Sequence, residues 1–450
     1  MHRPWKVGIV YDTKKIYLGG HDTHLAFRGL PNVEIAALAD SNSEKIDERM
    51  NAVRAKRHYL DYREMFDREN LDIVVLASRL PTDHYAQIRA AAERGIHVLV
   101  EKPMTNDLQE ADDLIRIAEA HHVKIAVALL ARHALVFRTM KRMIEEGAIG
   151  TPLTFYGRGK EDERGGGEDM VVLGTHILDI GCFLFGNPES VSAEVTVEGR
   201  ALRREDRSVT KEPLGPVAGD NVFALLRFPH GVRGIFESRK GLFRKQVRMG
   251  VSVVGTEGIL SVRYDDARKL RLSRTPFPPE DEAVYEEVPL VETRVIPGAE
   301  TPDFGYLKYF TDNNRFAAWD LMKSIEEDRR PEADAYNART VVEMINGVYA
   351  SQLSGRVIPL PLADRIHPLE KRERGEAGAY DSGCACSSAV VQPREGEGGV
   401  VSVVFPGPGV GRRLSPPDGD RGSCVHDLGR GLERYGRGVG ERECRSAGDL

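Results

Sequence analysis

The first third of the chain alternates between two sequence patterns, and this alternation limits the folds it can adopt. Short apolar runs have the length and β-branched content of buried strands: WKVGIV, VEIAALAD, LDIVVLAS, IHVLVEKP and VKIAVALLA. Between them lie stretches with helical character: HDTHLAFRGL, SEKIDERMNAV, PTDHYAQIRAAAERG and DLQEADDLIRIAEAHH. We expect Asp22 or Thr23 to cap the first helix and Ser43 the second. Strands separated by helices predict a parallel, doubly wound sheet, an α/β fold, over residues 1–125.

The pattern changes in residues 126–367. After one helix, LVFRTMKRMIEEGAIG, strand-like runs follow one another without intervening helices: LTFYGRG, SVSAEVTVEG, NVFALLRF, GVRGIFESR, VRMGVSVVG and GILSVRY. Two helical stretches come late, RFAAWDLMKSIEED and AYNARTVVEMINGVYASQLSG. This order predicts a second α/β domain with a largely antiparallel sheet.

Residues 368–450 have the composition of a low-complexity tail. After Lys371 the chain contains no Lys, Ile, Thr, Asn, Met or Trp, and Gly, Arg, Pro, Ser, Val and Glu dominate. Little apolar periodicity survives, so we expect disorder there. The tail is either an out-of-frame reading of GC-rich DNA or a natural disordered extension, and both origins remain open.

The overall charge excludes some classes of partner. With 63 basic and 69 acidic residues, the net charge of −6 gives no electrostatic footprint for nucleic acid. No apolar run approaches the roughly 20 residues that span a bilayer, and the N-terminus lacks the apolar core of a signal peptide. We therefore expect a cytoplasmic protein that acts on a small molecule. No Cys, His or Asp cluster has metal-ligand spacing, so no metal is predicted.

The turn after the first strand is a candidate phosphate-binding site of unusual form. Gly8 starts the expected pattern, but no G-x-G-x-x-G follows, and Gly19 and Gly20 come only just before the next helix. They could let the backbone approach a pyrophosphate, or they could serve only a flexible loop. Asp40 ends the second strand, where an acid can accept hydrogen bonds from a ribose and repel a 2′-phosphate. It favours NAD over NADP, although a helix-flanking aspartate is the alternative interpretation.

An ordered series of motifs resembles one family. The segment VLVEKPMT resembles the E-K-P signature of the Gfo/Idh/MocA oxidoreductases. PNVEIAALAD, MIEEGAIGTPL, LGTHILDIGCFLFG, SVVGTEGILSV and SGRVIPLPL follow in the family's order. The resemblance covers about residues 5–365. It implies an N-terminal Rossmann domain, and a C-terminal domain whose open sheet contacts substrate and forms a homo-oligomer.

The same resemblance implies the catalytic residues. Lys102 would lie between cofactor and substrate, flanked by Glu101 and Pro103 on the cofactor side, and its ammonium could assist proton transfer from a hydroxyl. His176 matches the family histidine that faces the nicotinamide and substrate. The chain departs from the family at Val172, where dehydrogenases commonly carry an aspartate.

Further polar residues could line the site. Glu168 and Asp169, just upstream of Val172, could replace the missing acid. By the same resemblance, Arg132 follows a strand end where family members contact substrate. Arg158 belongs to a glycine-rich loop that could hold a carboxylated or polyhydroxylated ligand, and a solvated loop of mixed charge is the alternative interpretation. Ser78 and Arg79 follow the third strand, where the family's cofactor-edge loop lies.

These observations predict an NAD(P)-dependent oxidoreductase that moves hydride to or from a sugar, polyol or related hydroxyl or keto compound. Two alternatives remain: a non-catalytic NAD-binding sensor or scaffold on the same fold, and a lyase or hydrolase that uses bound NAD. Val172 and the irregular glycine loop favour the sensor, whereas Lys102 and His176 together favour the enzyme.

Overall fold

The computed structural model describes residues 3–15, 21–210, 214–242, 249–264, 268–277, 284–301 and 308–371. All of them belong to one compact unit, Met1–Glu376. Gly19, Gly20 and the predicted tail from residue 372 onward lie outside the described residues.

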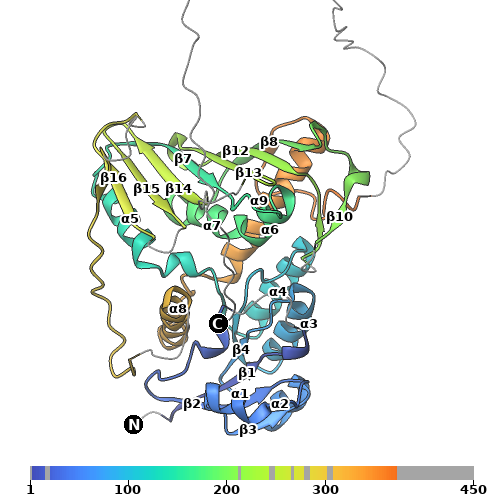
Figure 1. Ribbon diagram of the computed structural model, residues 1–450. Helices are drawn as coiled ribbons and strands as arrows, with labels where there is room; N and C mark the ends of the chain where they lie inside the picture. Colours follow the sequence, from blue (N-terminus) through green and yellow to red (C-terminus); the bar gives the residue numbers. More distant parts are fainter. Residues whose placement is uncertain are drawn as a thin grey trace, which may run out of the picture. The chain divides into compact units, whose positions relative to one another are not determined.

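The N-terminal part contains the predicted parallel sheet (Figure 1). Its six strands pair in parallel in the order β3-β2-β1-β4-β5-β6. Their bounds are β1 Trp5–Val10, β2 Val33–Ala39, β3 Arg57–Tyr59, β4 Ile73–Leu76, β5 His97–Val100 and β6 Ile125–Val127. This is the strand order of a dinucleotide-binding Rossmann fold, whose ligands bind beyond the carboxyl ends of the strands.

Apolar side chains from both faces of this sheet are buried, which is why its strands read as continuous apolar runs. Helices α3 (Pro81–Ala92) and α4 (Leu108–Ala120) pack on one face. The other face is covered by the short 3-10 helix η2 (Thr23–Leu25) and by α8 (Lys308–Glu326), which returns from far along the chain. The remaining helices of this part are α1, Ile46–Val53, and α2, Tyr62–Arg68.

Two local predictions were wrong. The helix expected after β1 is only the single turn η2, because Gly29 adopts a left-handed φ of 71° and Pro31 follows. Asp22 precedes this turn without capping it, and the Thr23 hydroxyl donates instead to Glu101. Ser43 does not cap α1, whose first helical residue follows Lys45 with no side-chain cap.

The C-terminal sheet is mixed and largely antiparallel, as predicted (Figure 1). Its strands follow the order β17-β16-β15-β14-β7-β13-β12-β8-β18, with β9 beside β8, and β7 and β13 form a parallel pair. The bounds are β7 Pro152–Arg158, β8 Ser190–Val197, β9 Arg200–Ala201, β12 Asn221–Arg227, β13 Arg233–Arg239, β14 Gly250–Gly255, β15 Ile259–Arg263, β16 Leu270–Ser273, β17 Glu286–Glu287 and β18 Ile358–Pro359. A separate two-stranded ribbon pairs β10 (Ser208–Val209) with β11 (Pro216–Val217).

Helices cover one face of this sheet and enclose a second core. They are α5 Leu135–Glu145, α6 Gly167–Val172, α7 Gly174–Phe185 and α9 Ala335–Ser354. Gly157 of β7 lets α7 approach the sheet, since a Cβ at this glycine would lie 2.4 Å from the Ile177 side chain. Helix α9 contacts both β8 and α4, so it packs against both parts of the unit.

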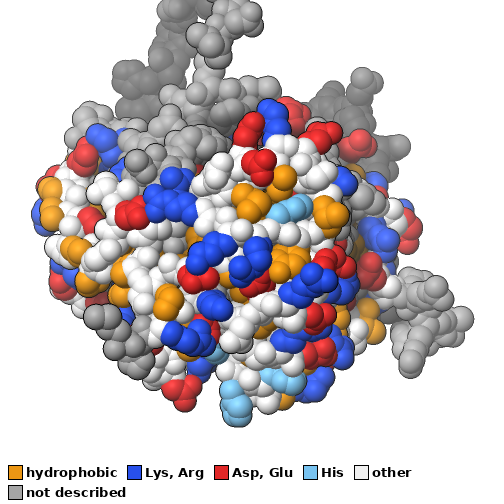
Figure 2. Space-filling model, turned by 90° about the horizontal axis from the view of Figure 1, so that it is seen from below, with side chains coloured by type: hydrophobic (Ala, Val, Ile, Leu, Met, Phe, Trp, Pro, Cys, Tyr) orange, Lys and Arg blue, Asp and Glu red, His pale blue; other side chains and the backbone are white. Residues whose placement is uncertain are grey.

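The described surface shows mixed charge. Lys, Arg, Asp and Glu side chains are intermingled over the face in Figure 2, as the nearly balanced composition leads one to expect. Among the described residues, no helix is both long and apolar enough to cross a bilayer.

Candidate active site

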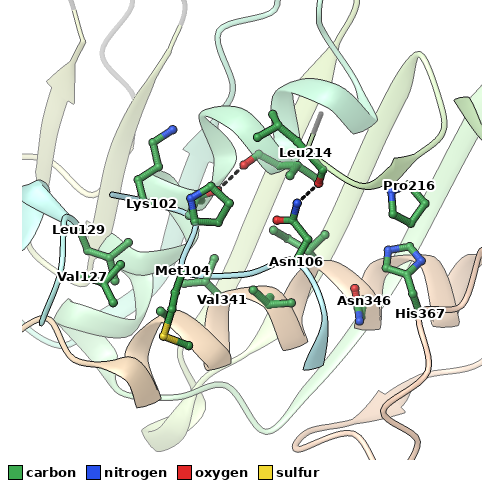
Figure 3. A pocket seen from close by; sticks show the side chains of 16 residues that line it. Lys102, Met104, Asn106, Val127, Leu129, Leu214, Pro216, Val341, Asn346 and His367 are labelled. Carbon is green, nitrogen blue, oxygen red and sulfur yellow. Dashed lines mark hydrogen bonds between the residues drawn. The ribbon is translucent and has the colours of Figure 1, made fainter. Parts of the chain in front are cut away.

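The predicted lysine lies in the interior, at the carboxyl end of β5. Lys102 is only 3% exposed, and its Nζ donates to the Val172 carbonyl oxygen at 2.7 Å. The Lys102–Pro103 peptide bond is cis. In Figure 3 the ammonium extends away from Met104 and Val341, which line a small apolar cavity below it. The lysine therefore reaches from the parallel sheet to the α6–α7 junction, a contact that the sequence prediction did not include.

Glu101 ties the segment after β1 to the same strand end. Its Oε1 accepts from Thr23 Oγ1 at 2.7 Å and lies 3.1 Å from His21 Nδ1, while Oε2 accepts from the Lys102 backbone N–H at 2.9 Å. Burial opposes ionisation, but His21, Lys102 and Thr23 outweigh it and hold the pKa of Glu101 well below its usual value. Glu101 is thus an ionised, buried anchor.

His176 lies in the first turn of α7, one turn beyond Val172. Burial, followed by the positive charges of Lys102 and His21, holds the pKa of His176 well below its ordinary value, and Glu101 only partly offsets them. The imidazole is therefore neutral near pH 7 and able to accept a proton. Lys102 and His176 thus lie at the same α6–α7 junction, and their shared catalytic role stays a prediction.

The two acids upstream of Val172 differ in their surroundings. Asp169 is fully buried, and its Oδ2 accepts from Ser238 Oγ at 2.6 Å and from the Glu161 backbone N–H at 3.2 Å. Burial raises the pKa of the Asp169 carboxyl. Glu168 is partly exposed in the first turn of α6. Asp169 thus holds the preceding loop against β13, and the substrate role of both acids stays a prediction.

The two predicted substrate arginines are engaged in ion pairs. Arg132 is buried in η3 (Leu130–Arg132) and donates from Nε and Nη2 to Asp179 of α7 at 2.8–3.0 Å. Arg158 of β7 pairs with Glu237 and donates to Tyr156 Oη at 3.0 Å. The sequence alone does not predict this pair, because Arg132 and Asp179 lie 47 residues apart. The pair fixes the helix that carries His176.

The carboxyl ends of β1, β2 and β4 form the other end of the candidate site. Gly8 is a packing glycine here, since a Cβ would lie 2.6 Å from Leu71 Cδ1. Ser78 accepts from the Asp12 backbone N–H at 3.1 Å, and Arg79 beside it is partly exposed. His84 of α3 also belongs to this region, and the sequence did not point to it. Its ring nitrogens lie 2.7 Å from the Ser78 carbonyl oxygen and 2.9 Å from the Pro103 carbonyl oxygen, so it connects the loop after β4 to the turn at Lys102.

A pocket of about 330 Å³ opens at these strand ends. It is lined by Val10, Asp12, Ala39, Ser41, Leu60, Asp61, Tyr62, Arg63, Thr82, Asp83, Ala86 and Gln87. Gln87 Oε1 is buried and has no hydrogen-bond partner among the described residues. A concave site at the carboxyl edge of a Rossmann sheet, with an orphaned acceptor in its wall, fits the adenosine half of a dinucleotide.

Both parts of the chain match known family models. Residues 17–129 match the family described as an oxidoreductase family with an NAD-binding Rossmann fold, and residues 137–261 match the GFO/IDH/MocA C-terminal domain. Together the two matches account for more than half of the chain.

Relatives with named activities support the same assignment. D-apiose dehydrogenase of Paraburkholderia graminis is 31% identical over 193 residues, which cover 40% of this chain and 51% of that protein. Levoglucosan dehydrogenase of Pseudarthrobacter phenanthrenivorans is 24% identical over 261 residues, 52% of this chain and 66% of that protein. The solved complex of levoglucosan dehydrogenase with NADH and levoglucosan superposes with a TM-score of 0.62 at 20% identity, covering 80% of this chain and 100% of that one. The alignment therefore spans about half of the first relative's length, and the structural likeness shows the fold.

Proposed function

The chain belongs to the Gfo/Idh/MocA family of oxidoreductases, and on that premise we propose that it transfers hydride between a nicotinamide cofactor and a sugar or polyol. The observation that carries the proposal is the buried Lys102, which reaches the α6–α7 junction and acts on the electrostatics of His176 there. A lysine this deeply buried without a catalytic task is uncommon. The relatives named for D-apiose and levoglucosan support a sugar-like substrate.

We assign proton transfer and charge stabilisation to His176 and Lys102. When bound, the nicotinamide takes hydride from a CH–OH carbon or returns it to a carbonyl carbon. In the oxidising direction the hydroxyl proton must leave as the carbonyl forms, and the neutral His176 imidazole can accept it. The Lys102 ammonium stabilises the developing negative charge on the same oxygen. In the reducing direction His176 returns the proton to the oxygen, and Lys102 again stabilises the negative charge that develops on it.

At position 172, where family dehydrogenases commonly carry an aspartate, the main chain holds the catalytic lysine. Val172 cannot accept a proton through its side chain, but its carbonyl oxygen holds Lys102 in place. An acid at this position would add a second acceptor for a polyol hydroxyl. We therefore propose that this chain depends on His176 alone for the base.

We propose NAD as the cofactor, with NADP bound less well. The adenosine pocket contains three carboxylates, Asp12, Asp61 and Asp83, against one guanidinium, Arg63. This excess of negative charge disfavours a 2′-phosphate.

We propose a homo-oligomer formed through the C-terminal sheet. On β12, exposed and buried residues alternate, and Phe223 and Leu225 are 43% and 41% exposed on the face away from the helices. Glu237 and Arg158 lie in register beside them and supply charges of both signs. Such a face suits an isologous contact with a second copy. Analytical ultracentrifugation of the Phe223→Glu variant should show a smaller species than the wild type.

Substitution of the lysine tests the catalytic proposal. Lys102→Met should lower turnover with NAD by roughly 10²–10⁴-fold in a screen of sugars and polyols, because one positioned proton-transfer group is lost. The matched control is Lys56→Met, which removes an exposed lysine paired with Glu34. Near-full turnover in Lys102→Met would reject the catalytic role. Wild-type protein that binds NAD and turns over no substrate in a broad screen would instead favour a sensor.

A further inference from the structure

Asp40, the acid expected to contact the cofactor ribose, is already fully engaged within the protein. It is 1% exposed. Its Oδ1 accepts from the backbone N–H groups of Thr13 and Asn42 at 3.1 and 2.9 Å. Its Oδ2 accepts from Thr13 Oγ1 at 2.8 Å and lies 2.8 Å from Arg49 Nε. With three hydrogen bonds and one ion pair on its two oxygens, Asp40 fixes the turn after β1, and it is absent from the wall of the adenosine pocket.

Asp12 stands in the pocket wall instead. Its side chain is partly exposed, and its Oδ1 accepts from Ser41 Oγ at 2.7 Å and from the Lys14 N–H at 3.2 Å. Its backbone N–H donates to Ser78 Oγ. The residue is therefore tied to the ends of both β2 and β4, and its carboxylate is held where a ligand in the pocket meets it. A carboxylate fixed in this way can accept hydrogen bonds from a vicinal diol.

Gln87 supplies a second, independent sign of a ligand. The residue is 5% exposed, lies on α3 and lines the pocket, and its Oε1 has no hydrogen-bond partner among the described residues. A buried acceptor without a partner destabilises the ligand-free protein, so a ligand that donates to it gains affinity. The exocyclic amine of adenine is such a donor. Leu60, 60% exposed in the same wall, offers an apolar surface for the ring.

We propose that Asp12 and Gln87, rather than Asp40, recognise the adenosine half of the cofactor, Asp12 through the ribose hydroxyls and Gln87 through the adenine amine. This inference rests on the proposed function, because it assumes a nicotinamide dinucleotide as ligand. Asp40 is a positioning residue, which holds the turn from which Asp12 projects. A 2′-phosphate would meet the Asp12 carboxylate directly, so this residue also selects NAD over NADP.

Calorimetric titration of the full chain with NAD⁺ and NADP⁺, in the absence of any substrate, tests the assignment. Asp12→Asn should weaken NAD⁺ binding by about tenfold, the loss expected when a hydrogen bond to a charged group becomes one to a neutral group. The affinity for NADP⁺ should stay the same or increase, so the ratio of the NAD⁺ affinity to the NADP⁺ affinity should fall. Asp67→Asn, which removes an exposed carboxylate paired with Arg94, is the matched control and should change neither affinity.

Gln87→Met gives two readouts of opposite sign. NAD⁺ and NADP⁺ should both bind about five- to tenfold more weakly, because both carry adenine. The thermal midpoint of the ligand-free protein should stay level or rise, because a buried acceptor without a partner has been removed. A residue that merely packs would lower the midpoint and leave the affinities unchanged, which would overturn the role of Gln87.

Asp40→Asn separates the two aspartates. It should lower the thermal midpoint and weaken both cofactors in parallel, with the NAD⁺ to NADP⁺ ratio preserved. A ratio that collapses in Asp40→Asn and persists in Asp12→Asn would overturn the inference and restore Asp40 as the ribose contact. Wild-type protein that binds neither dinucleotide would reject the proposed function itself, and the inference with it.

Discussion

The candidate site has two ends, one at β5 and one at β1 and β2, and polar groups at the strand ends are held in place by different kinds of contact. At the end of β5, the candidate residues Glu101 and Lys102 are held by partners on other segments: His21 and Thr23 contact Glu101, and the Val172 carbonyl accepts from Lys102. At the ends of β1 and β2, the contacts join two adjacent turns: Asp40 accepts from Thr13, 27 residues away, and Asp12 accepts from Ser41, 29 residues away.

The difference shows which kind of site a sequence motif describes. The E-K-P segment follows a four-residue buried strand whose register is fixed by both neighbours, so its position follows from the fold. The turn after β1 has no G-x-G-x-x-G, and its two acids accept from different donors: Asp40 from Thr13 and Asn42, and Asp12 from Lys14 and Ser41. Side-chain hydrogen bonds then decide which carboxylate faces the pocket, and these bonds cannot be predicted from the position of an acid at the end of a strand.

The largest effect on turnover is expected when the proposed base, His176, is removed. His176→Ala should lower turnover by roughly 10²–10⁴-fold while NAD⁺ affinity changes little, because the imidazole handles the substrate proton. Combined with Lys102→Met, it should add far less than the product of the single effects, since both groups act on one proton transfer. Steady-state kinetics of the three variants provides the measurement, and strictly multiplicative losses would show that the two residues act separately.

Loss of the buried ion pair between Arg132 and Asp179 should lower the stability of the protein strongly. Asp179→Asn removes the partner of the buried Arg132, and we expect the free energy of unfolding to fall by about 3–5 kcal/mol, the usual cost of an uncompensated buried charge. Urea denaturation measures the loss. The double variant Arg132→Met with Asp179→Leu should recover much of it, because no charge is left unpaired. A double variant no more stable than Asp179→Asn would mean that the pair contributes through geometry that apolar groups cannot replace.

The pH dependence of oxidation should reflect the lowered pKa of His176. The pKa of His176 is held below its ordinary value near 6.5, so the neutral, proton-accepting form persists as the pH falls through 6.5 and is lost only at lower pH. Oxidation should therefore show no histidine-dependent acid limb near pH 6.5, and the limb that disappears in His176→Ala should lie below it. A pH–rate profile of wild type and variant checks this. A limb at or above pH 6.5 that depends on His176 would contradict the lowered pKa of the imidazole.

The smallest effect is expected from the C-terminal tail. Leu369 is 4% exposed and belongs to the second core, and Glu370 and Lys371 form ion pairs with Arg207 and Asp364. A chain ending at Lys371 should therefore keep the thermal midpoint and NAD⁺ affinity of the full chain. One ending at Leu360 should not, and serves as the control. A loss of soluble protein on removal of residues 372–450 would show that the tail contributes to the fold.

Much of the fold was visible in the sequence because parallel strands buried on both faces read as unbroken apolar runs. The antiparallel sheet followed from strands without helices between them. Other features depend on partners far away in the chain. Thr23 donates to a carboxylate 78 residues later, and Arg132 pairs with Asp179 across 47 residues, distances over which local propensity carries no information. Lys102 and His176 were found through a resemblance, whereas Val172 as an acceptor could be found only in three dimensions.

The acceptor that holds Lys102 belongs to the main chain, and this has an evolutionary consequence. Every residue type carries a carbonyl oxygen, so no point mutation at position 172 deletes this anchor. The Val172 side chain, 2% exposed, packs in the second core, so packing limits which side chains this position accepts, whereas the main-chain anchor is the same for all of them. Evolution at position 172 is therefore constrained by the volume and polarity of the side chain and not by the need to hold Lys102.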